Sequence, residues 1–111
     1  MGSYKEVMPQ DVFQIFQTKG QIQLLDVRES DEFAEVSIPF SHLLPLSQLN
    51  VADLTKDLPP QWDKQEPLYV ICRSGGRSAK ACELLQKAGC KDLYNVVGGV
   101  LAWQAASLPT R

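Results

Sequence analysis

Several features that mark common classes of protein are missing from this chain of 111 residues. No apolar run approaches the roughly 20 residues that a membrane-spanning helix needs. There is no excess of positive charge for nucleic acid or an anionic membrane surface, because 13 acidic residues outnumber 11 basic ones. The first residues lack the basic and then hydrophobic pattern of a secretory signal. We therefore expect a cytoplasmic protein whose partners are small molecules or proteins, not membranes or nucleic acid.

Cysteine is also scarce. Three cysteines cannot all pair within one chain, so at least one thiol should be free. Their positions, 72, 82 and 90, leave nine and seven residues between them, whereas zinc sites use pairs only a few residues apart. We expect no metal site.

The length and the composition are those of one globular domain, with 44% hydrophobic and 22% charged residues. No linker rich in proline, glycine or serine divides the chain, so we expect a single domain over residues 1–111. Apolar runs predict strands at residues 6–8, 23–27, 67–72 and 92–97, and helical spacing predicts helices at 9–20, 31–35, 48–58 and 77–88. Ser30 and Ser47 are the expected N-caps of the second and third helices. This alternation predicts an α/β fold with a mostly parallel sheet and helices on both faces.

Chemistry-bearing residues concentrate in the stretch CRSGGRS, from Cys72 to Ser78. Cys72 ends an expected strand, where parallel sheets usually bind ligands. Gly75 and Gly76 allow a tight turn whose N–H groups can bind an anion, and the following helix adds its positive end. Arg73 and Arg77 add two full charges. Such surroundings commonly lower a cysteine pKa to between about 3.5 and 7.5, so Cys72 is the expected nucleophile.

Other notable residues favour structural roles. Cys82 and Cys90 lie at or beside the apolar side of the expected helix, and we interpret both as packing residues. Asp26 and Arg28 could form an ion pair near the sheet end. Trp103 is interpreted as a core anchor, and the pair Gly98 and Gly99 as a tight turn.

The loop CRSGGRS resembles the active-site loop of the rhodanese-type sulfurtransferases. Residues 24–33, LLDVRESDEF, and residues 98–109, GGVLAWQAASLP, resemble the entry and C-terminal segments of that family, so the resemblance covers nearly the whole chain. It implies a rhodanese-like, five-stranded fold. It also implies that Cys72 takes sulfane sulfur from thiosulfate or from a protein persulfide, holds it as a persulfide, and passes it to a thiol or cyanide, with no cofactor.

In the same reading, Arg73 and Arg77 bind the anionic donor, while backbone N–H groups of the loop stabilise the persulfide; the substrate-binding residues are then Arg73, Ser74, Gly75, Gly76, Arg77 and Ser78. The sequence departs from the family at residues 36–41, VSIPFS, where Gly-His-Ile-Pro-Gly-Ala is usual. Ser37 replaces the histidine and Phe40 the second glycine, which predicts a reshaped region near the site. His42 inherits no catalytic role and is expected to be structural.

Two other functions fit parts of this pattern. A thiolate in an anion-binding loop also suits a phosphatase or an arsenate reductase, but those enzymes usually place five residues between cysteine and arginine, and Arg77 leaves four. A rhodanese-like module without activity could instead recruit a partner, although the presence of Cys72 argues against it.

Overall fold

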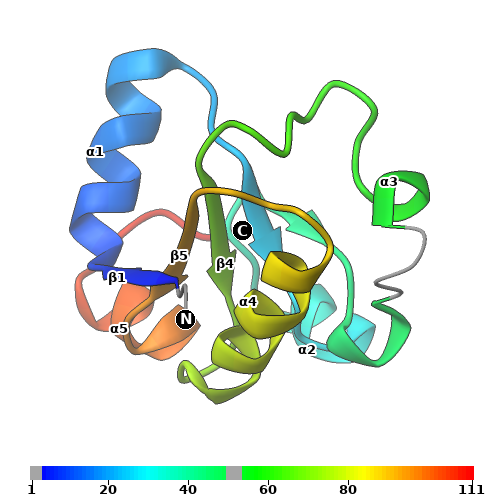
Figure 1. Ribbon diagram of the computed structural model, residues 1–111. Helices are drawn as coiled ribbons and strands as arrows, with labels where there is room; N and C mark the ends of the chain where they lie inside the picture. Colours follow the sequence, from blue (N-terminus) through cyan, green and yellow to red (C-terminus); the bar gives the residue numbers. More distant parts are fainter. Residues whose placement is uncertain (1–3, 50–53) are drawn as a thin grey trace.

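The computed structural model of the chain describes residues 4–49 and 54–111. Five strands form one sheet in the order β1-β5-β4-β2-β3, and every neighbouring pair is parallel (Figure 1). The strands are β1 (Lys5–Val7), β2 (Leu24–Asp26), β3 (His42–Leu43), β4 (Leu68–Ile71) and β5 (Leu93–Val96). The expected α/β fold with a parallel sheet is confirmed.

Helices connect the strands in the manner that parallel pairing requires. They are α1 (Pro9–Lys19), α2 (Ser30–Glu35), α3 (Leu54–Asp57), α4 (Gly76–Lys87) and α5 (Gly99–Ala105), with a 3₁₀ turn, η1 (Leu46–Gln48). Proline opens α1, where its missing N–H costs nothing, and Gly20 ends that helix with a φ of 78°. No helix in the described ranges is long and apolar enough to cross a membrane.

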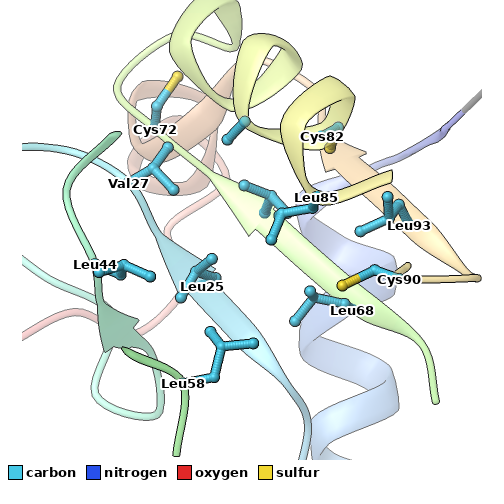
Figure 2. Packing of buried hydrophobic residues seen from close by; sticks show 12 residues of the cluster. Leu25, Val27, Leu44, Leu58, Leu68, Cys72, Cys82, Leu85, Cys90 and Leu93 are labelled. Atoms are coloured by element: carbon cyan, nitrogen blue, oxygen red, sulfur yellow. The ribbon is translucent and has the colours of Figure 1, made fainter. Parts of the chain in front are cut away.

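Two apolar clusters cover the two faces of the sheet because successive strand residues point to opposite sides. One cluster joins Leu25, Val27 and Val70 of the strand region to Ala81, Cys82 and Leu85 of α4, as Figure 2 shows for most of its members. The other joins Leu24 and Ile71 to Val12 of α1 and to Val100 and Trp103 of α5. Helices therefore cover both faces. The expectation that Trp103 anchors the core is confirmed, since its side chain is fully buried.

Two local expectations were wrong, and a third is confirmed only in part. The N-cap of α2 is Glu29, not Ser30. The Glu29 side chain accepts the backbone N–H of Glu32, and the Glu32 side chain accepts the backbone N–H of Glu29, which together form a capping box. Ser47 caps no helix; it lies inside η1, and its hydroxyl donates to the Glu29 carboxylate at 3.0 Å. The helix expected over residues 48–58 is represented by α3 alone, and residues 50–53 lie outside the described part of the chain.

Candidate active site

The loop that begins at Cys72 lies at the carboxyl end of β4 and runs into α4. Figure 2 shows Cys72 beyond the strand and Cys90 at the other end of the same cluster. Cys72 is 1% exposed, so its sulfur lies on the floor of the loop. The Gly75 N–H donates to Cys72 Sγ at 3.1 Å, and Gly75 adopts a φ of 115°, a conformation that other residues rarely take. The glycine thus turns the chain so that its amide points at the sulfur.

The surroundings favour ionisation at Cys72 but not at the other two cysteines. Burial by itself raises the pKa of the Cys72 thiol, but hydrogen bonds from the Ser78 hydroxyl, in the orientation that faces the sulfur, and from the amides of Ser78, Gly75 and Ser74 outweigh it, so the pKa is lowered from its ordinary value. Burial raises the pKa of Cys82 to about 12, and it raises the pKa of Cys90. All three thiols are free. Cys72 is therefore the most acidic of them.

The side chain of Arg77, in α4, is paired with a carboxylate of α2. Its guanidinium donates to both carboxylate oxygens of Glu32 in α2, at 2.7 and 2.8 Å. Glu32 Oε1 also accepts the Glu29 N–H at 3.0 Å, as part of the capping box. The hydrogen bond from Arg77 holds the pKa of Glu32 at about 2, so the pair stays charged at neutral pH. Arg77 consequently fastens the start of α4 to α2.

Arg73 differs from Arg77 in the exposure of its side chain and in its lack of a side-chain partner among the described residues. Its side chain is exposed and forms no hydrogen bond or ion pair within the described part of the chain. The sequence suggested two equivalent cations beside the sulfur, whereas the structure leaves Arg73 available and pairs Arg77. Neither arginine donates a hydrogen bond to Cys72 Sγ. The other predicted loop residues, Ser74 and Gly76, are exposed at the loop surface.

The start of α5 supports the loop from a distant part of the sequence. The amides of Val100 and Leu101 donate to the carbonyl oxygens of Cys72 and Arg73 at 2.9 and 3.1 Å. Gly99 sits against this backbone with a φ of 61°, and a Cβ there would lie 2.5 Å from the Arg73 carbonyl oxygen. The sequence indicated only a tight turn at this glycine pair. The turn is present, but its second glycine also opens a helix that holds the loop.

Asn95 of β5 also reaches the loop, and sequence reasoning missed it. Its side chain lies between Ser78 and the Gly75 carbonyl, with Asn95 Oδ1 at 2.5 Å from Ser78 Oγ and Asn95 Nδ2 at 3.3 Å from Gly75 O. Ser78 Oγ is in turn 3.3 Å from Cys72 Sγ. The only available signal was a polar residue in the apolar strand segment LYNV.

The segment in front of the loop is fixed by a buried ion pair. Arg28 donates through Nε and Nη2 to Asp26, with a shortest distance of 2.8 Å, and both side chains are almost fully buried. Arg28 also donates to the carbonyls of Glu32 and Val36, at 3.3 and 2.8 Å, so its charge is well satisfied. The ion pair expected from the sequence is present, and it positions the chain around α2.

The unusual residue Phe40 packs against the apolar cluster of Val12 and Trp103, whereas Cys72 belongs to the other cluster. Its ring stacks on Phe16 with centroids 3.8 Å apart and meets Trp103 edge-on at 5.9 Å. Phe40 and Phe16 line a hollow of about 570 Å³ together with Trp62 and Tyr69, and Cys72 does not line it. His42 packs its ring against Trp62 at 5.7 Å, consistent with a structural histidine. No group of metal-binding side chains occurs in the described ranges.

Comparison with known proteins assigns the family. The model of the rhodanese-like domain matches residues 9–106, so the chain belongs to the rhodanese-like domain family. A rhodanese-related protein from Thermoplasma volcanium has a similar structure, with a TM-score of 0.78 at 29% identity, covering 97% of this chain and 98% of that one. The rhodanese-like, five-stranded fold is confirmed.

Several of the sequence relatives are named for rhodanese domains or for sulfur transfer, and others are uncharacterized proteins. A putative sulfurtransferase, YtwF, from Bacillus subtilis is 31% identical over 95% of both chains. A rhodanese-like/PpiC domain-containing protein from Arabidopsis thaliana is 37% identical over 81% of this chain. The present chain spans 30% of that protein, and 54% and 60% of two other curated relatives. What those longer proteins do as a whole is therefore not transferred.

Proposed function

We propose that this protein is a sulfurtransferase that carries sulfane sulfur on Cys72. The observation that carries the proposal is the position of Cys72 Sγ under the amide of Gly75, at 3.1 Å, at the base of a loop that lowers the pKa of the thiol. Membership of the rhodanese-like family and the sulfurtransferase names of relatives support the reaction class.

The proposed reaction is a double displacement. The Cys72 thiolate attacks the outer sulfur of thiosulfate, a new S–S bond forms, the bond inside thiosulfate breaks, and sulfite leaves with the electron pair. Attack of an acceptor thiolate or of cyanide on the outer sulfur then releases the Cys72 thiolate. A protein persulfide can replace thiosulfate, because the bond that breaks is again a sulfur–sulfur bond. The reaction needs no metal or organic cofactor to balance.

The residues of the loop have different roles in binding the donor and stabilising the persulfide. The exposed charge of Arg73 attracts the anionic donor, while the amides of Ser74, Gly75 and Ser78 offset the negative charge that the persulfide brings away from water. Arg77 contributes through its pairing with Glu32, which holds the first turn of α4 in place. Gly76 leaves open space at the loop surface for the donor.

Mass spectrometry of the intact protein tests this proposal. Treatment with thiosulfate or a small persulfide should add one sulfur atom, and cyanide should remove it. Cys72→Ser should abolish the gain, since a hydroxyl does not store sulfane sulfur, whereas Cys82→Ser and Cys90→Ser should keep it. Wild-type protein that gains no sulfur from either donor contradicts the proposal; hydrolysis of an aryl phosphate by that protein would instead indicate the phosphatase reaction.

A further inference from the structure

Asn95 is an unusual residue for its position. It lies on β5 between half-buried Tyr94 and buried Val96, it is 5% exposed, and it takes no part in the apolar clusters. Both polar ends of its side chain point to the Cys72 loop: Nδ2 to the Gly75 carbonyl at 3.3 Å and Oδ1 to the Ser78 hydroxyl at 2.5 Å. Within the described residues, Asn95 forms no other side-chain hydrogen bond.

The chemistry of these partners fixes the orientation of the amide. The Gly75 carbonyl can only accept, so the atom that faces it must be the Asn95 nitrogen; the reversed amide would place two carbonyl oxygens against each other. The Asn95 oxygen then faces Ser78. That oxygen can only accept, and it lies 2.5 Å from Ser78 Oγ, whereas the Gly75 carbonyl oxygen, another possible acceptor, lies 3.1 Å away. The single hydroxyl hydrogen of Ser78 is therefore directed at Asn95.

The Cys72 sulfur is a second possible acceptor for the same hydroxyl hydrogen. Ser78 Oγ lies 3.3 Å from Cys72 Sγ, within reach of a hydrogen bond that would stabilise a thiolate. To make that bond the hydroxyl must turn away from Asn95, which leaves the buried Asn95 oxygen without a donor. Gly75 O offers no substitute, because it is an acceptor. The Ser78 hydroxyl can therefore satisfy Asn95 or the thiolate, but not both.

We infer that Asn95 is a positioning residue that, by holding the Ser78 hydroxyl, limits how far the Cys72 thiolate is stabilised. A thiolate that is stabilised less is a stronger nucleophile at the same degree of ionisation. Asn95 would then keep the sulfur reactive toward the donor, whereas a more stabilised thiolate would attack the donor more slowly and leave the persulfide faster. The inference rests on the proposed role of Cys72 as the nucleophile, but its test reads ionisation and not sulfur transfer.

The test is the pKa of Cys72, measured from the pH dependence of its alkylation by iodoacetamide with peptide mapping. Asn95→Leu removes the nearest competing acceptor. Gly75 O stays 3.1 Å from Ser78 Oγ, but it already accepts the Ala79 amide and is neutral, so the charged thiolate is the stronger acceptor for the released hydroxyl. The pKa of Cys72 should fall by about one unit, because one buried hydrogen bond is commonly worth about that much. In a Ser78→Ala background, Asn95→Leu should leave the pKa unchanged, since no hydroxyl remains to be released.

Two further variants make the result decisive. Asn95→Val carries the same prediction with a smaller side chain, for the case that leucine is not accommodated. Tyr94→Phe, on the same strand but outside the loop contacts, should not move the pKa of Cys72. An unchanged pKa in the folded Asn95 variants overturns the inference, as does a shift that persists without Ser78. Failure of sulfur uptake would bear on the proposed function only, because iodoacetamide reports the thiol directly.

Discussion

Gly99→Ala is the substitution for which the structure predicts the clearest loss of stability near the site. Gly99 has a φ of 61°, which costs an L-residue about 1 kcal/mol relative to glycine. The added Cβ would also press on the carbonyl groups of Cys72 and Arg73, and these are backbone atoms that cannot move aside alone. The start of α5 must therefore shift away from the loop.

The size of the effect follows from what that shift breaks. The amides of Val100 and Leu101 would lose their bonds to the two loop carbonyls, and each such bond contributes about 1 kcal/mol. Together with the backbone strain, we expect Gly99→Ala to lower the free energy of unfolding by about 3 kcal/mol. A domain of ordinary stability, about 5 to 15 kcal/mol, would remain folded.

Urea denaturation measures this loss, and Gly20→Ala provides the matched control. Gly20 has a φ of 78° at the end of α1, but a Cβ there meets nothing within 4 Å. It carries the strain without the collision, so its cost should be about 1 kcal/mol. If both variants lose the same stability, the contact of Gly99 with the loop has no energetic weight and the reasoning is refuted. Of these two variants, only Gly99→Ala should change the pH profile of Cys72 alkylation.

Three other outcomes are expected. Glu32→Gln removes the ion pair with Arg77, in which the pKa of the Glu32 carboxyl is held at about 2 in the folded chain. The stability that this pair gives the wild type, about 1 kcal/mol, should be present above pH ~4.5 and lost as the pH falls toward ~2. A variant with the same acid unfolding curve as the wild type would contradict this. Arg73→Ala should raise the KM for thiosulfate about fivefold at low salt, because one screened charge contact with the donor is lost. Arg77→Ala should raise the KM less. Equal effects of the two variants in steady-state kinetics would show that the pairing of Arg77 with Glu32 does not affect donor binding. Phe40→Ala should cost about 2 kcal/mol in urea denaturation through lost ring packing, with the alkylation profile of Cys72 unchanged; an altered profile would connect this residue to the site.

Four of the five described strands and the cysteine loop could be predicted because their signals are local, whereas the two-residue strand β3 has no such signal. Residues 67–72 form an apolar run, and the glycines and basic residues that follow Cys72 are adjacent in the sequence. The pairing of Arg77 with Glu32 could not be predicted in this way. The two residues are 45 positions apart, and their contact depends on the direction in which α2 leaves the sheet.

The support of the loop by Asn95 and by α5 was missed for a related reason. A single asparagine in an apolar strand has no pattern that identifies its partner, and α5 is seven residues long and begins with a glycine, which disfavours helix. The error at Ser30 is different. Serine is the commoner N-cap, but Glu29 and Glu32 form a reciprocal pair of side-chain bonds that serves the same end.

The parallel pairing of β1 with β5 has a consequence for how the protein is made. Lys5 pairs with Tyr94, so β1, the first strand of this sheet to be synthesised, must wait for β5, the last one. Contacts of such long sequence separation slow folding and make it cooperative. Gly99 and the start of α5, which hold the carbonyl groups of Cys72 and Arg73, also belong to this late part of the domain. The loop around Cys72 therefore gains this support only after β5 and α5 have been synthesised, so the full setting of the thiol is acquired late in the synthesis of the domain.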